Sequence, residues 1–177
     1  MLPEELRKRF RNYKSGLAEA ESMIGDKVPV KVDQGESFCD QFDLDVRLFC
    51  SYLAATDGRL SQQEVDFMNT IMDKNYSHGT YMFLLQEEGW GTPEKREQYE
   101  KSSISSFKIA ICLDFLFEKM GRKTSFVDSV IDLFLEAGMS LCYADGITEQ
   151  EEEDIRSFIM TKNQEARNTI SALNGHQ

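Results

Sequence analysis

Two Asp-Gly turns, each followed by a glutamate at the same distance, are the part of this sequence best suited to chemistry. In each turn the aspartate stands seven residues before the glutamate: Asp57 before Glu64, and Asp145 before Glu152. Carboxylate oxygens are hard ligands, so four of them would suit Ca²⁺, Mg²⁺ or Mn²⁺ rather than a soft metal. The pattern predicts that these four side chains converge on one divalent cation. We call the two segments, residues 57–64 and 145–152, the acidic corners.

The acidic corners belong to a longer internal repeat. A shift of 88 residues aligns residues 57–75 with residues 145–163 without a gap, and nine of the nineteen positions are identical. Each unit has the pattern of a turn, a helix start, a buried Ile-Met pair and a final Lys-Asn. The repeat therefore predicts two equivalent helix-turn-helix units, around residues 38–75 and 126–163, related by a pseudo-two-fold axis.

The same carboxylates also have a purely structural interpretation. Asp57 and Asp145 can cap their own turns, and Glu64 and Glu152 can complement the dipoles at helix N-termini. Capping alone does not require the same glutamate offset after the same Asp-Gly twice, so both interpretations stay open. Glu151 adjoins Glu152 and could replace it as a ligand. An EF-hand is excluded, because the Asp-x-Asp-x-Asp-Gly run and the glutamate at loop position twelve are absent.

Helices must position these corners, because the hydrophobic pattern predicts seven helices and no strand. Periodic apolar residues and turn signals place the helices at about residues 3–24, 37–56, 61–75, 77–87, 93–120, 124–144 and 148–174. Capping-box spacing at Ser61 with Glu64, and at Thr148 with Glu151, supports two of the starts. The second half of the helix over residues 93–120 is apolar on nearly every side, which predicts that it lies at the buried centre. The expected fold is an all-α bundle.

Composition predicts a globular chain in a reducing compartment. The 177 residues fit one helical domain over residues 37–177, preceded over residues 1–36 by an amphipathic helix and a linker arm. The four cysteines form no Cys-x-x-Cys pair and are interpreted as buried thiols. Charged residues interrupt the most apolar run, so no segment is expected to cross a membrane. A cytoplasmic location follows.

The charge balance restricts the partners. Lys and Arg number 20 against 31 Asp and Glu, so the net charge of −11 would repel nucleic-acid phosphates, and we expect no nucleic-acid partner. The first helix runs against this trend, with the basic residues Arg7, Lys8, Arg9, Arg11 and Lys14. It could make peripheral contact with an anionic membrane. The alternative is that its apolar stripe packs on the bundle.

Aromatic residues near the middle of the chain form a second candidate surface. Trp90 is close in sequence to Tyr81, Phe83 and Tyr99. Together they could form an exposed patch for an unknown protein partner. The alternative is a loop tryptophan folded over the core.

The sequence contains few residues that could form a catalytic site. His78 lies in a polar turn and His176 in the C-terminal tail, which leaves no basis for a His-based triad or a Cys-His dyad. The enzymatic alternative is a carboxylate-bridged metal hydrolase, because divalent ions held by Asp and Glu can activate water. The Glu-x-x-His signature of di-iron proteins is absent.

The corners also carry a family resemblance. Residues 54–64 read Ala-x-x-Asp-Gly-x-Leu-Ser-x-x-Glu, and residues 143–148 read Tyr-Ala-Asp-Gly-Ile-Thr. These motifs resemble the TerB-like (tellurite-resistance protein B) helical family, over roughly residues 38–165. The resemblance implies a seven-helix bacterial domain with duplicated halves and an acidic cluster for divalent cations, associated with stress response and membrane-linked complexes. Its candidate ligands are Asp57, Glu64, Asp145 and Glu152. Ile147 stands one position earlier than Leu60, so the geometry of the second corner is left open.

These observations predict a non-enzymatic, cytoplasmic, TerB-like module that binds a divalent cation at its duplicated turns, in stress response or complex assembly. The rival prediction is a metal-free adaptor, or an inhibitor of a basic partner, that uses its acidic surface as the interface. A carboxylate-metal hydrolase is the third.

Overall fold

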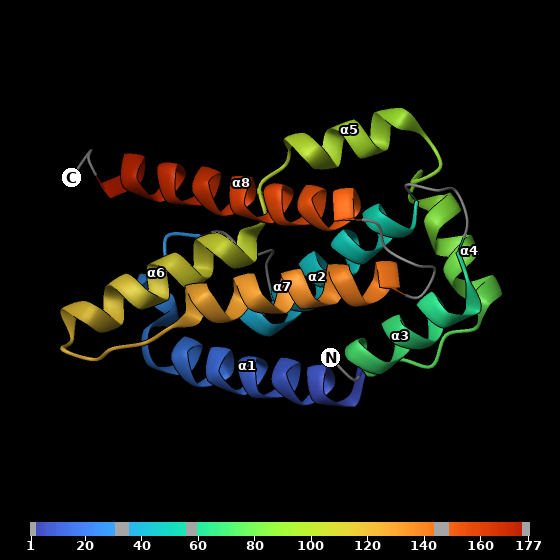
Figure 1. The fold of residues 1–177 in the computed structure, drawn as a ribbon. Coiled ribbons are helices and arrows are strands. Elements are labelled where there is room, and N and C mark those ends of the chain that lie inside the picture. The colour runs from blue at the N-terminus through green and yellow to red at the C-terminus, as the bar shows by residue number, and fades with distance from the viewer. Residues whose placement is uncertain (1–2, 31–35, 56–59, 144–148, 175–177) are drawn as a thin grey trace.

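Every regular element in the described part of the chain is helical. The computed structural model describes residues 3–30, 36–55, 60–143 and 149–174. Over these residues it contains α1 (Pro3–Ile24), η1 (Gly25–Lys27, a 3₁₀ turn), α2 (Phe38–Ala54), α3 (Gln62–Met72), α4 (His78–Glu87), α5 (Pro93–Lys101), α6 (Ser105–Lys119), α7 (Phe126–Tyr143) and α8 (Glu149–Asn174). Figure 1 shows them as a helical bundle. The predicted all-α class is confirmed.

Local capping explains why several helices begin where the sequence predicts. Ser37 accepts a hydrogen bond from the backbone N–H of Asp40, whose carboxylate accepts one from the Ser37 N–H in return. At the start of α5, Thr92 accepts from the N–H of Lys95, and Pro93 occupies the first helical position. Each bond satisfies a helix N-terminal donor that otherwise has no partner.

The single helix predicted over residues 93–120 is wrong, because the chain breaks between α5 and α6. Ser102 has extended backbone, and its hydroxyl donates to the Tyr99 carbonyl at 2.8 Å, a bond that competes with helix continuation. The restart depends on Asp45 of α2, which accepts hydrogen bonds from both the N–H and the hydroxyl of Ser106 at 2.7 Å. Asp45 is 61 residues away in the sequence, so local patterns do not reveal this cap.

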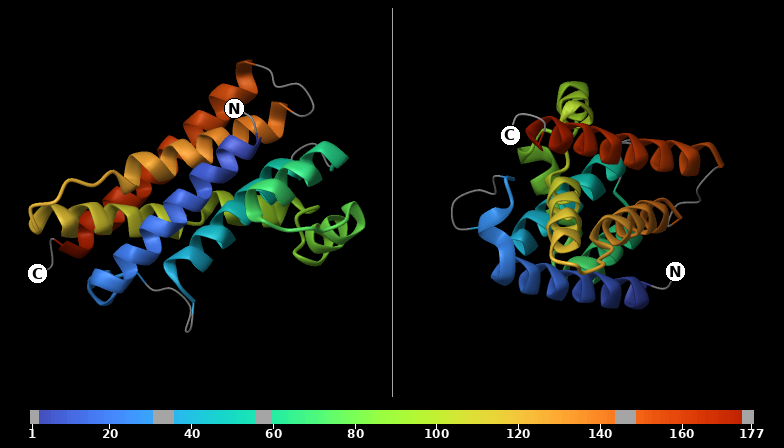
Figure 2. Two further views of the ribbon diagram at one scale, coloured as in Figure 1. Left: turned by 90° about the horizontal axis from the view of Figure 1, so that it is seen from below. Right: turned by 90° about the vertical axis from the view of Figure 1, so that its left-hand side faces the viewer.

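The core is centred on α7. This helix contacts α1, α2, α6 and α8, and both views show it between α1 and α8 (Figures 1 and 2). The buried ring of Phe134 lies at 6.2, 5.4 and 5.2 Å, centroid to centroid, from the rings of Phe42, Phe49 and Phe107. The expectation that the α6 segment lies at the buried centre is confirmed for one face only: α6 contacts α1, α2, α7 and α8 and buries Phe107 and Leu113, whereas Phe115 on its outer face is 39% exposed.

The first helix is an integral part of this core. Its apolar stripe is buried and belongs to the same cluster of core side chains as α2, α6 and α7. Its basic residues reach neighbouring helices: Arg7 and Arg11 bind Asp73, Arg9 binds Glu136, and Lys14 binds Asp43. The stripe therefore packs on the bundle, as in the second of the two alternatives considered from the sequence.

Among the described helices, none combines the length and the apolar character needed to cross a lipid bilayer.

Candidate functional site

The described half of the first acidic corner is a capping box. Glu64 is the third residue of α3, its carboxylate accepts from the Ser61 N–H at 2.6 Å, and its own N–H donates to the Ser61 hydroxyl at 3.1 Å. The side chain is only 6% exposed. The predicted capping box at Ser61 is confirmed, and Glu64 complements the N-terminus of α3.

The second corner has a different register. α8 begins at Glu149, which aligns with Ser61 in the repeat, so α8 starts one residue earlier than α3. Glu151 is the third described residue of α8, the position that Glu64 holds in α3; Thr148, its predicted capping-box partner, lies outside the described residues. Glu152 instead accepts from Arg156 at 3.4 Å, one turn further along α8. The two glutamates that match in sequence therefore have different surroundings.

Asp57 and Asp145 lie outside the described residues, so the predicted convergence of the two corners stays a prediction. Within the described ranges, no group of three or more His, Cys, Asp or Glu side chains has an arrangement that could hold a metal ion. The helix ends that flank the corners can be located. In Figure 1, α2 and α7 end, and α3 and α8 begin, toward the same end of the bundle.

The described parts of the repeat agree in their first turns and diverge afterwards. In both units a glutamine donates to the aspartate one turn later at 2.8 Å: Gln62 to Asp66, and Gln150 to Asp154. The unit ends differ. α3 stops at Met72, three residues before the predicted Asn75, whereas α8 continues to Asn174. The internal two-fold repeat is therefore not confirmed, although both units share this glutamine–aspartate contact.

Long-range contacts cause this divergence. Asp73, directly after α3, has left-handed backbone with φ 53° and binds the guanidinium groups of Arg7 and Arg11. In α8, Lys162 is 2% exposed and donates to the Glu100 carbonyl oxygen. Its repeat counterpart, Lys74, is exposed. The same residue type thus has a buried structural role in one unit only.

Asp45 is a buried carboxyl group that belongs to none of the motifs in the sequence. Its three hydrogen bonds come from the Ser106 N–H and hydroxyl and from the Gln41 amide. Burial raises the pKa of Asp45 to about 6, against the opposing effect of these hydrogen bonds. A perturbed carboxyl can mark an active site, but here it caps α6 inside the core. The available signal was an aspartate on the apolar face predicted over residues 37–56.

The cysteines and the described histidine lack the surroundings of a nucleophilic pair. None of the four cysteines forms a disulfide; Cys50 and Cys112 are buried as predicted, whereas Cys39 and Cys142 are half-buried. Burial raises the pKa of Cys50 to about 12 and that of Cys112 to about 11, so both thiols stay protonated. His78 contacts a backbone carbonyl oxygen through Nε2 at 2.6 Å. His176 lies outside the described residues.

Of the two interpretations of the aromatic residues around Trp90, packing over the core is the one that the structure bears out. Trp90, Tyr81 and Tyr99 are buried, and the indole N–H of Trp90 donates to Glu88 at 2.9 Å. Phe83 differs, with 59% of its surface exposed on α4. The interpretation of Trp90 as an exposed anchor is wrong, because its ring packs edge-on against Tyr99 at 5.5 Å.

Comparison of the chain with family models, with curated proteins and with solved structures finds no match in any of the three. The TerB-like resemblance stays a prediction from the corner motifs.

Proposed function

We propose that this protein is a non-enzymatic, cytoplasmic binding module that holds one divalent cation between its two acidic corners. The observation that carries the proposal is the repeated Asp-Gly turn with its glutamate at the same offset. The flanking helix ends lie toward one end of the bundle (Figure 1), which is a requirement for a shared site. The oxygen ligands favour Ca²⁺, Mg²⁺ or Mn²⁺.

The capping role of Glu64 is compatible with this proposal. A carboxylate has two oxygens with about four lone-pair sites in total, so the hydrogen bond from Ser61 does not exhaust the group. In the second corner, Glu151 occupies the helical position of Glu64, while Glu152 occupies its aligned sequence position. We propose Asp57, Glu64, Asp145 and Glu152 as the ligand set, with Glu151 as the substitute for Glu152.

Thermal melting after EDTA treatment, with each ion then added separately, tests the site. An ion at a hundredfold excess over its Kd stabilises the native state by about 2.7 kcal/mol. For a chain of this size that corresponds to a rise in Tm of about 5 to 10 °C. The shift should disappear in both Asp57→Asn and Asp145→Asn. Glu118→Gln removes an exposed carboxylate at the end of α6 and serves as the control, which should keep the shift.

Titration calorimetry distinguishes a shared site from two independent ones. A shared site binds one ion per chain, and either aspartate substitution abolishes binding. Two independent corners would bind two ions, with one lost in each variant. If none of the three ions changes the Tm of the wild-type protein, the cation proposal fails. Phosphoester turnover that requires the same aspartates would instead favour the hydrolase alternative.

A basic protein partner is the second candidate, favoured by the exposed acidic start of α8. Glu149, Glu151 and Glu153 are all exposed there. An oligolysine peptide serves as a basic probe in fluorescence titrations at low salt. Replacement of these three glutamates by glutamine should weaken binding more than the matched triple substitution of the exposed residues Glu87, Glu94 and Glu118. Equal losses would indicate only a response to net charge and would exclude a defined interface there.

The resemblance to TerB-like proteins supplies the proposed biological setting, stress response or the assembly of a complex.

A further inference from the structure

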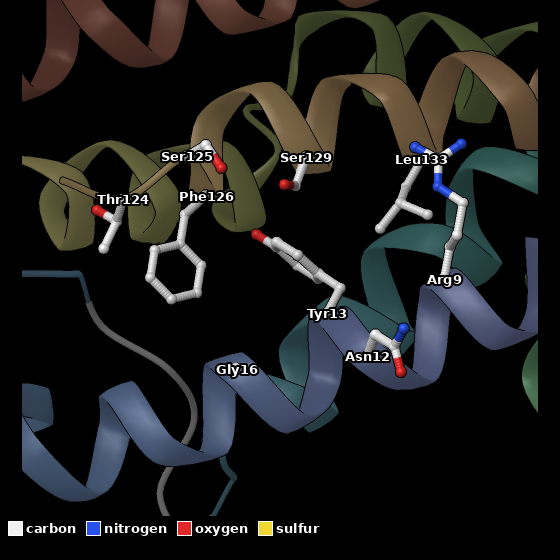
Figure 3. Close-up of a pocket in the computed structure, with 9 residues that line it drawn as sticks. All are labelled: Arg9, Asn12, Tyr13, Gly16, Thr124, Ser125, Phe126, Ser129 and Leu133. Carbon is white, nitrogen blue, oxygen red and sulfur yellow. The ribbon is translucent and has the colours of Figure 1, made fainter.

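A cleft of about 450 Å³ lies between α1 and the beginning of α7, and none of its lining residues belongs to the corner motifs. Arg9, Tyr13 and Gly16 line it from one face of α1, at spacings of four and three residues. Phe126 and Ser129 line it from the first turn of α7. Figure 3 shows the two groups of side chains on opposite sides of the cleft. Its volume is within the range of small-molecule sites.

The Tyr13 side chain carries the observation that points to a ligand. Its ring is buried against Phe42 at 4.9 Å and Phe126 at 6.1 Å, centroid to centroid. Its hydroxyl is fully buried and has no hydrogen-bond partner among the described residues. In Figure 3 this hydroxyl points toward the start of α7, where Ser125 and Ser129 lie. A buried hydroxyl without a partner is destabilising, so a ligand that supplies one is favoured.

The charge of the ligand is restricted by Asp114 of α6. Its carboxylate accepts from the N–H groups of Phe126 and Val127 at 2.9 Å and from the Thr124 hydroxyl at 2.5 Å. The donors at the start of α7, which could otherwise attract an anion, are therefore already bound to a carboxylate. Burial, and to a lesser extent the Asp114 charge, raises the pKa of Tyr13 well above its usual value. The phenol thus stays protonated beside the cleft.

The one cation on the cleft wall within the described residues is neutralised in the same way. The Arg9 guanidinium contacts the Glu136 carboxylate and lies 3.8 Å from that of Asp132. The remaining polar groups of the cleft are neutral: Asn12, Thr124 and the serine hydroxyls beside Tyr13. Phe126 and Leu133 add apolar surface. This combination suits a molecule with one apolar face and an uncharged polar edge.

We propose that the cleft binds a neutral planar amide, whose apolar body contacts Phe126 and whose carbonyl oxygen accepts a hydrogen bond from the Tyr13 hydroxyl. An amide N–H group would donate to the Ser129 hydroxyl, which lies on the side toward which the Tyr13 hydroxyl points (Figure 3). This site is independent of the proposed cation function, because it shares no residue with the acidic corners.

Three probes of nearly equal shape test the site: benzamide, benzoate and benzamidine. In ¹⁵N-resolved NMR titrations, benzamide should shift the backbone amide signals of Tyr13, Gly16 and Ser129 saturably. Benzoate should bind at least about tenfold more weakly, because the carboxylates of Asp114, Glu136 and Asp132 repel it. Benzamidine should also be weaker, because it has no carbonyl acceptor for Tyr13. Benzoate or benzamidine binding as tightly as benzamide would overturn the proposed ligand class.

Tyr13→Phe separates a ligand contact from a packing role. The substitution keeps the ring, so the Tm of the free protein should be unchanged or higher, while the affinity for benzamide should fall about tenfold. Tyr76→Phe, on an exposed ring outside the cleft, is the matched control and should keep the affinity. Gly16→Leu should block the cleft, since a Cβ added at Gly16 already lies 3.6 Å from the Phe126 ring. Unchanged benzamide affinity in Tyr13→Phe, or no saturable shift in the wild-type protein, would overturn the proposal.

Discussion

Replacement of Asp45 by asparagine should change how the stability of the protein depends on pH. The Asp45 side chain is 7% exposed, and burial raises its pKa to about 6 from an ordinary value of 3.8. The hydrogen bonds from Ser106 and Gln41 favour the ionised form but do not outweigh the loss of hydration. Asparagine keeps the size of the side chain and one acceptor oxygen but cannot ionise.

The sign follows from the proton balance. Because the pKa of Asp45 is higher in the folded state than in the unfolded chain, the folded protein binds more protons between about pH 4 and pH 6. The stabilisation from the protonated carboxyl is complete below the unfolded pKa and is lost as the pH rises through the folded pKa. A difference of about two pKa units corresponds to roughly 3 kcal/mol in the free energy of unfolding.

Urea unfolding of the wild type and of Asp45→Asn, at intervals from about pH 4 to 8, measures this difference. Subtraction of the two curves cancels the other carboxyl groups. The wild type should lose roughly 3 kcal/mol relative to the variant across this range. Asp128→Asn, at an exposed position on α7, is the control and should show no such fall. A difference in the free energy of unfolding between wild type and Asp45→Asn that stays constant with pH would refute the reasoning. If the wild type instead gained stability relative to Asp45→Asn as the pH rises, the hydrogen bonds would be holding Asp45 ionised.

Two further predictions concern buried contacts, both measured by chemical or thermal unfolding. Lys162→Met keeps the aliphatic stem but leaves a backbone carbonyl of α5 without its donor, so we expect a loss of about 1 to 3 kcal/mol. Lys74→Met, at the exposed repeat counterpart, should lose far less; equal losses would contradict the assigned role. Gly138→Ala would place a Cβ 3.0 Å from the Phe49 ring and should destabilise by about 1 to 2 kcal/mol. Gly16→Ala makes only ordinary contacts and should gain up to about 1 kcal/mol from helix propensity, so a change of the same sign in both glycine variants would refute this comparison.

The predicted helix bounds and caps agree with the structure where they depend on residues close together in the sequence. The first helix has its predicted bounds, Pro3 to Ile24, because a stripe of apolar residues at helical spacing is readable within the segment. The capping box of Ser61 and Glu64 spans four residues and is equally readable. The break at Ser102 cannot be predicted from the local sequence, because α6 restarts with the help of Asp45 from another helix.

The candidate site also combines local features, which the sequence shows, with long-range features, which it does not. The paired acidic turns are a property of the sequence, and the capping box of Ser61 and Glu64 at the start of α3 confirms one part of the local geometry. The capping-box spacing of Thr148 and Glu151 already indicates a different register for α8, whereas the pairing of Glu152 with Arg156 was not predictable from the repeat. The Tyr13 cleft was also unpredicted, because it joins residues more than a hundred positions apart.

The sequence by itself determined the helical class, most helix starts and the acidic character of the surface, because periodicity, capping and charge act within a few residues of chain. Only the tertiary structure decided that α7 shares the centre of the bundle with α6, where α5 and α6 divide, and which polar groups are buried. Asp45, Asp114 and Lys162 each bind a partner in another helix. Their roles depend on distances that arise only when those helices pack together.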